Sequence, residues 1–167
     1  MKTLVIHPRD HSTKFLEDIY VGLDCTVHRS NRSVRSLIKS HDRIICLGHG
    51  TANGLLQIPY NGSFVVDSRH VQLLREKECI FIWCYANLFM KKYGLKGFAT
   101  GMFISEMDEA LQYCVPFERG DIEQSNSRFA RLIKENISAD DLYAKVKAEY
   151  GQLTSYVSQF NLSELCH

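Results

Sequence analysis

Two side chains that together could carry out chemistry stand at the ends of apolar runs. His49 follows the run RIICLG and is flanked by Gly48 and Gly50, and Cys84 ends the run CIFIWC. A thiolate is a strong nucleophile, and a nearby imidazole can lower the pKa of the thiol or accept its proton, and can later protonate a leaving amine. The pair therefore predicts nucleophilic attack on a carbonyl carbon, provided that the fold brings the two side chains together.

The segments that would position this pair follow an alternating pattern of strands and helices. Apolar runs of the kind found in buried parallel strands are followed by segments with helical spacing of apolar residues. This alternation predicts an α/β fold in one domain over residues 1–167, a three-layer α-β-α sandwich with a mostly parallel sheet. Strands are predicted over 3–7, 25–28, 43–48, 79–84 and 97–104, and helical segments near 15–20, 34–38, 107–114, 129–137 and 142–150, with Ser12 or Thr13 capping the first helix, Ser30 or Asn31 the second and Asp140 the last.

Sites in open α/β sheets form at the carboxyl ends of the strands. If strands 43–48 and 79–84 are neighbours, their ends lie about 5 Å apart, and His49 and Cys84 can reach one carbon atom. The backbone N–H groups of Gly50 and Cys84 are then candidate oxyanion donors, and the glycines beside His49 would let a substrate backbone approach. Taken singly, a cysteine that ends an apolar strand is more often a buried structural thiol, and Gly-His-Gly is more often a turn.

One segment departs from the alternation. In residues 54–67, Asn61-Gly62 stands between two apolar runs, which is a strong signal for a β-hairpin. Pro59 restricts the first arm of this hairpin to a sheet edge. We expect a small β-hairpin directly after the histidine strand.

Composition excludes several classes of function. The chain has 167 residues and a net charge of +1, so neither nucleic acid nor an anionic membrane is indicated as a partner. Six cysteines without a CxxC motif, a short apolar run at the start and no long apolar stretch predict a reduced, cytoplasmic protein without a membrane span. No cofactor or metal is expected, because the other histidines show no ligand spacing: His7, His11, His28, His41 and His70.

The order of these motifs resembles the caspase-like (clan CD) cysteine peptidases, and within them the CHAT-domain branch. IICLGHGTANGLL resembles the segment with the family's histidine, and ECIFIWCYA resembles the strand that ends in its nucleophilic cysteine. GLKGFATGMFISEMDEALQY resembles the next strand and helix, and SRFARLIKENI and ADDLYAKVKAEY fall where the family has its closing helices. The resemblance covers most of the chain.

The resemblance implies a cysteine endopeptidase that acts through an acyl-enzyme on a protein or peptide substrate. It assigns Cys84 as nucleophile, His49 as general base and acid, and the amides of Gly50 and Cys84 as oxyanion donors. Many relatives have glycine where this chain has Ala86, which loosens the motif without removing a reacting group. Because the chain has no room for the sensor repeats of some relatives, a separate regulatory protein or a small-molecule activator is expected.

Charged residues near strand ends often set specificity in this family. Asp10 and Glu106 are the candidate substrate-binding residues and would favour Lys or Arg before the scissile bond. Arg9 is the opposing candidate, and each of the three could instead be a solvated surface charge. Trp83 is expected on the sheet face opposite to Cys84, as core or as a wall of the site.

Two other functions are compatible with the sequence. A catalytically inactive caspase-fold binding or scaffold module would keep the same elements without an activated thiol. A different hydrolase or a nucleotide-binding α/β protein has the least support, because GxGxxG, GxxxxGK[ST] and GxSxG are all absent.

Overall fold

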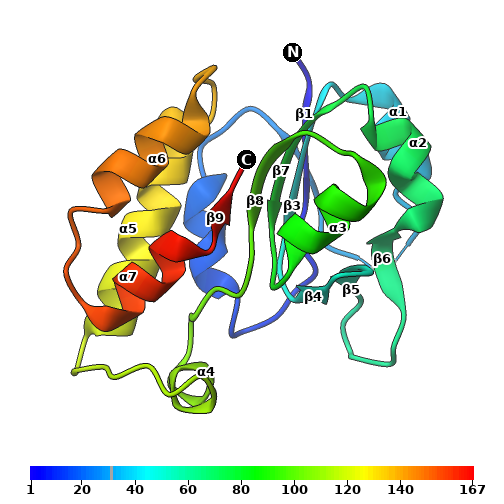
Figure 1. The fold of residues 1–167 in the computed structure, drawn as a ribbon. Helices are drawn as coiled ribbons and strands as arrows, with labels where there is room; N and C mark the ends of the chain where they lie inside the picture. Colours follow the sequence, from blue (N-terminus) through cyan, green and yellow to red (C-terminus); the bar gives the residue numbers. More distant parts are fainter. Residues whose placement is uncertain (31) are drawn as a thin grey trace.

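A six-stranded, mostly parallel sheet forms the centre of the computed structural model, which describes residues 1–30 and 32–167. The strand order is β2-β1-β3-β7-β8-β9, in which the first five strands are parallel and β9 runs antiparallel to β8 (Figure 1). Each predicted strand is present, although the last ends at residue 100 instead of 104. The strands are β1 (Thr3–Ile6), β2 (Thr26–His28), β3 (Arg43–Leu47), β7 (Glu78–Ile82), β8 (Gly97–Thr100) and β9 (Leu165–Cys166).

Helices cover both faces of this sheet, as the alternation predicts. The short helices α1, α2 and α3 bury one face, and the 3-10 helix η1 with α5 and α6 buries the other (Figure 1). The layered α/β architecture is therefore confirmed. The helices are η1 (Lys14–Ile19), α1 (Arg35–Ser40), η2 (Ser68–His70), α2 (Val71–Leu74), α3 (Ala86–Tyr93), α4 (Met107–Gln112), α5 (Asp121–Asn136), α6 (Leu142–Tyr150) and α7 (Tyr156–Ser163).

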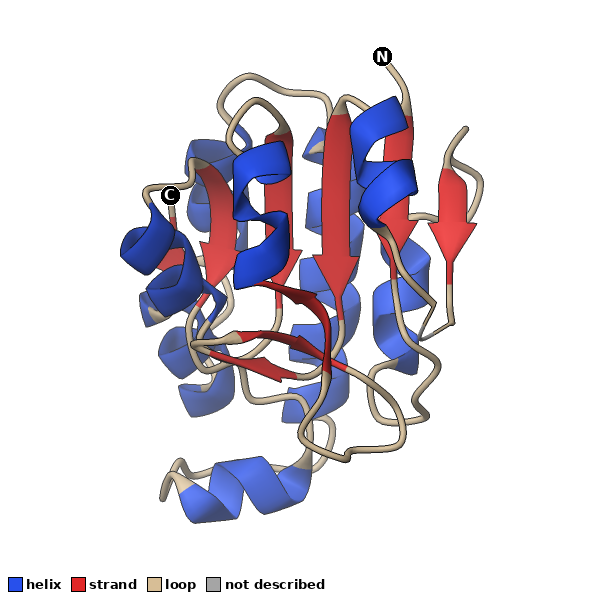
Figure 2. Cartoon of the chain, turned by 90° about the vertical axis from the view of Figure 1, so that its right-hand side faces the viewer, coloured by secondary structure: helices blue, strands red, loops and turns tan. Residues whose placement is uncertain are grey.

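The predicted hairpin is present and belongs to a small second sheet. β5 (Gly54–Leu56) pairs antiparallel with β6 (Phe64–Asp67), and β4 (Gly50–Thr51) adds a third strand that the sequence analysis missed. Pro59 lies in the loop between β5 and β6 and not in a strand arm, because proline has no N–H to donate to a ladder. Figure 2 shows this small sheet next to the carboxyl ends of the parallel strands.

Several local expectations differ from the structure. Thr13 precedes η1 and Val34 precedes α1, and neither forms a side-chain cap. Asp141, one residue after the predicted Asp140, precedes α6 and likewise forms no side-chain cap, while Asn31 lies outside the described residues. Helices α3 and α7 were not predicted; each spans only eight residues, and the apolar stripe of α7 is weak. Within the described chain, no helix combines the length and apolarity needed to cross a membrane.

Candidate active site

His49 and Cys84 follow neighbouring strands, as predicted. β3 and β7 are paired in parallel with Leu47 opposite Ile82, and the Gly48 amide donates to the Ile82 carbonyl at 3.1 Å. His49 and Cys84 each lie two residues beyond this last pair, at the same edge of the sheet. Both line one small cavity there.

This cavity is narrow. It encloses about 20 Å³, which is room for little more than one water molecule. The rings of Phe15 and Phe103 stack in its wall with centroids 6.4 Å apart. The space beside His49 and Cys84 is therefore small in this conformation. The remaining lining residues are Thr13, Leu16, Gly48, Ile82, Trp83, Thr100, Ser105 and Glu109.

Cys84 lies at a sharp change of backbone direction between β7 and α3. Tyr85 has φ 68°, a left-handed conformation that costs a residue with a side chain about 1–2 kcal/mol. The Tyr85 amide donates to the Gly101 carbonyl at 3.0 Å, so the loop after β8 supports the strained turn. Strained backbone clusters at active sites and ligand clamps, although Cys114, outside this cavity, is left-handed too.

The Cys84 thiol is protonated at neutral pH in this environment. Burial raises the pKa of the thiol to about 11, and the carboxylate of Glu109 raises it too. The backbone amides of Phe103 and Cys84 act in the opposite direction by donating to the sulfur. Because two amides face the sulfur, the Phe103 N–H joins the Cys84 N–H as a candidate oxyanion donor, which the sequence analysis missed.

Glu109→Gln is expected to make Cys84 more reactive. Loss of the carboxylate charge removes one cause of the raised pKa, so the thiolate fraction at pH 8 rises. We expect iodoacetamide to alkylate Cys84 about two- to fivefold faster, which corresponds to a pKa decrease below one unit. Glu106→Gln removes the same charge from the same helix end and is the control. An equal increase in both variants would contradict a specific role for Glu109.

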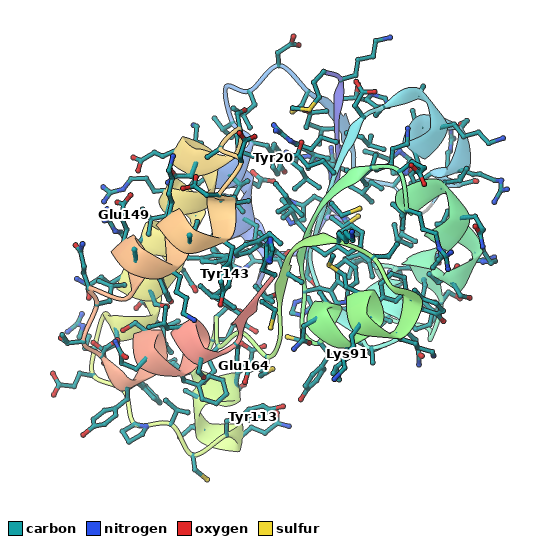
Figure 3. The ribbon with its side chains drawn as sticks, turned by 45° about the horizontal axis from the view of Figure 1, so that its top comes forward. Tyr20, Lys91, Tyr113, Tyr143, Glu149 and Glu164 are labelled. Carbon is teal, nitrogen blue, oxygen red and sulfur yellow. The ribbon has the colours of Figure 1, made fainter. Side chains whose placement is uncertain are left out.

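The loop that carries Phe103 is held by the C-terminal segment. Glu164 accepts from the Gly101 amide through its carbonyl at 2.7 Å and from the Met102 amide through its carboxylate at 2.9 Å. Tyr113, at the end of α4, shares a hydrogen bond with the Tyr85 hydroxyl. Figure 3 labels Glu164 and Tyr113, which come from these two segments. Residues distant in sequence therefore fix the surroundings of Cys84.

The His49 imidazole is held by the loop after β1 and by Tyr60. Its Nε2 lies 2.6 Å from the Ser12 hydroxyl and 3.9 Å from a carboxylate oxygen of Asp10. The Tyr60 ring packs edge-on against it, with centroids 5.6 Å apart and an interplanar angle of 87°. Within the described residues, no hydrogen bond joins His49 to the Cys84 thiol. Ser12, proposed from sequence as a helix cap, contacts the imidazole instead.

The space left by the missing side chain of Gly50 is filled by protein and is not open to a substrate. A Cβ at this position would lie 2.1 Å from Cδ1 of Trp83, so the indole fills the space that the missing side chain leaves. Trp83 is buried and donates from Nε1 to the Thr51 carbonyl at 3.1 Å, which makes it both core and site wall, as expected. The Leu56 amide donates to the His49 carbonyl. In an antiparallel ladder, residues that form hydrogen bonds to the partner strand alternate with residues that do not, so the amide of Gly50, the next residue, points away from β5.

The candidate specificity residues occupy different positions. Asp10 lies beside His49, whereas Glu106 is exposed and caps the start of α4. Glu106 is not among the cavity-lining residues, and Glu109, one helical turn later, is. Arg9 is exposed.

Two other histidines are held in structural contacts, whereas His11 is exposed. His7 is buried between Tyr20 and Thr13, and burial lowers its pKa to about 4. His41 contacts the Leu37 carbonyl and Thr26. Among the described residues, no group of three or more His, Cys, Asp or Glu side chains could hold a metal ion.

A comparison with protein-family models and with curated proteins finds no match to this chain. The resemblance to caspase-like peptidases therefore stays a prediction from the sequence motifs.

Proposed function

We propose that this chain is a caspase-like cysteine endopeptidase in which Cys84 is the nucleophile and His49 the general base and acid. One observation carries the proposal: β3 and β7 are adjacent and parallel, and the two side chains that follow them line the same cavity. Strained backbone directly after Cys84 and two amides directed at its sulfur add support.

The proposed reaction has two halves. His49 accepts the thiol proton while the sulfur attacks the peptide carbonyl carbon, and the amides of Cys84, Phe103 and Gly50 are candidates to stabilise the oxyanion. The C–N bond then breaks, and His49 gives the proton to the leaving amine. Water, deprotonated by His49, hydrolyses the thioester and releases the carboxylic acid and the free thiol.

The same site geometry suggests which substrates the proposed peptidase prefers and how its activity is switched on. The carboxylate of Glu109 lines the cavity and favours Lys or Arg before the scissile bond. The narrow cavity and the neutral thiol correspond to a latent form. We expect a regulatory protein or a small-molecule activator to widen the cavity before a peptide can bind.

Cys84→Ala is expected to abolish peptide cleavage and to leave cooperative unfolding intact, because the sulfur forms the only covalent bond to the substrate. The experiment is a cleavage profile of the full chain on a peptide library, with thermal unfolding of each variant. Cys114→Ala, which removes an exposed free thiol outside the site, is the control. Retained cleavage by purified Cys84→Ala protein would end the proposal.

A catalytically inactive binding or scaffold module of the same fold is the second candidate. The high pKa of Cys84 and the absence, within the described chain, of a hydrogen bond between the dyad residues favour it. The two functions differ in how Cys84 responds to His49. In a peptidase, iodoacetamide alkylates Cys84 faster in the wild type than in His49→Gln at pH 7.5, and in a scaffold the two rates are equal.

A further inference from the structure

Asp10, Ser12 and Tyr60 form a connected network on the side of His49. One carboxylate oxygen of Asp10 accepts from both the amide and the hydroxyl of Ser12, at 2.9 Å each. The other accepts from the Tyr60 hydroxyl at 2.8 Å. The Ser12 hydroxyl in turn lies 2.6 Å from Nε2 of His49. Ser12 therefore bridges the carboxylate and the imidazole.

The protons in this network can be assigned by counting donors. A serine hydroxyl has one proton, and an ionised carboxylate can only accept. Burial alone would raise the pKa of Asp10, but the bonds from Tyr60 and Ser12 and the nearby His49 outweigh it and hold the pKa below its ordinary value. The Ser12 proton thus points to Asp10, and the short contact to His49 requires Nε2 to be the donor.

We propose that Asp10 and Ser12 are positioning residues, which hold the imidazole of His49 with its proton on Nε2 and leave Nδ1 as the base. The position and tautomer of His49 do not depend on the proposed function. Only the role of Nδ1 as a catalytic base rests on it. The Tyr60 ring, packed edge-on against the imidazole and bonded to Asp10, limits rotation of both groups. Asp10 then acts on His49 instead of binding the substrate directly.

The tautomer is measured directly by long-range ¹H–¹⁵N NMR on the full chain with labelled histidine at pH 8.5. His49→Gln identifies the signal. The wild type is expected to show the Nε2–H form. Ser12→Ala removes the bridge and should populate the Nδ1–H form, whereas Ser12→Thr keeps a hydroxyl and should restore Nε2–H. An Nδ1–H form in the wild type, or no change in Ser12→Ala, would overturn the proposal.

A double-mutant cycle tests whether the two residues act as one unit on the alkylation of Cys84 by iodoacetamide. We expect Ser12→Ala and Asp10→Ala each to slow the reaction by about tenfold, part of the roughly 10²–10⁴ that a general base supplies. The double variant should be no slower than either single variant. If the two rate reductions multiply in the double variant, as for two independent sites, Asp10 does not act on His49 through Ser12.

Asp10→Asn covers the case in which Asp10→Ala does not fold. Asparagine keeps one oxygen that can accept from Ser12 and replaces the oxygen that accepts from Tyr60 with an NH2 donor, so the Nε2–H form should persist. Two separate measurements test the positioning of His49 and the peptidase proposal. Equal alkylation rates in the wild type and His49→Gln would refute the peptidase, while the NMR signal of His49 tests the positioning by Asp10 and Ser12 on its own.

Discussion

His49→Ala is expected to lower peptide cleavage by about 10²–10⁴, the contribution of a general base. The pH dependence should change with it. Without the imidazole, the thiol must ionise unaided, and its pKa of about 11 leaves little thiolate near neutrality. The residual rate should therefore rise about tenfold per pH unit between pH 7 and 10, because the thiolate fraction rises by that factor below the pKa.

The measurement is a pH–rate profile of cleavage or of Cys84 alkylation in the wild type and in His49→Ala. His28→Gln is the control, because this partly buried imidazole contacts Ser30 and the Arg32 carbonyl and lies outside the site. The wild type should exceed His49→Ala most at pH 7 and least at pH 10. Parallel profiles with equal rates would show that His49 does not act on the thiol.

Gly50→Ala is expected to destabilise the fold by about 3 kcal/mol, at the upper end of the cost of overpacking a core. The new Cβ would lie 2.1 Å from Cδ1 of Trp83 and 2.7 Å from the Gly54 carbonyl oxygen. Neither neighbour can move freely, since Trp83 is buried in the core and Gly54 is paired with Asp67 in the small sheet. Chemical denaturation of the purified variant measures the loss.

A matched glycine separates this clash from backbone strain. Gly94 has φ 63° and nothing within 4 Å of its Cβ position, so Gly94→Ala should cost only the left-handed conformation, about 1–2 kcal/mol. Introducing Trp83→Ala should reduce the additional cost of Gly50→Ala, because alanine lacks the Cγ and Cδ1 atoms that clash. A Gly50→Ala protein as stable as the wild type would contradict the packing described for this position.

The sequence by itself predicted the layered α/β fold and most of its strands and helices. Continuous apolar runs such as RIICLG and CIFIWC are typical of central strands, and their alternation with helical segments leaves a layered, mostly parallel sheet as the simplest arrangement. Asn61-Gly62 between two apolar runs likewise predicted the hairpin. The placement of His49 and Cys84 after the ends of two strands followed from these local patterns, whereas the pairing of β3 with β7 was a condition that only the structure met.

Only the tertiary structure decided what surrounds the two side chains. Serine is a residue type that often caps helices. Ser12 contacts His49 instead, because β1 and β3 are paired in parallel and the segments that follow them lie at the same edge of the sheet. Glu109 lines the cavity and Glu106 does not, a difference of one helical turn that depends on how α4 packs. Burial sets the state of the Cys84 thiol, and burial is a sum over residues distant in sequence, which no local pattern contains.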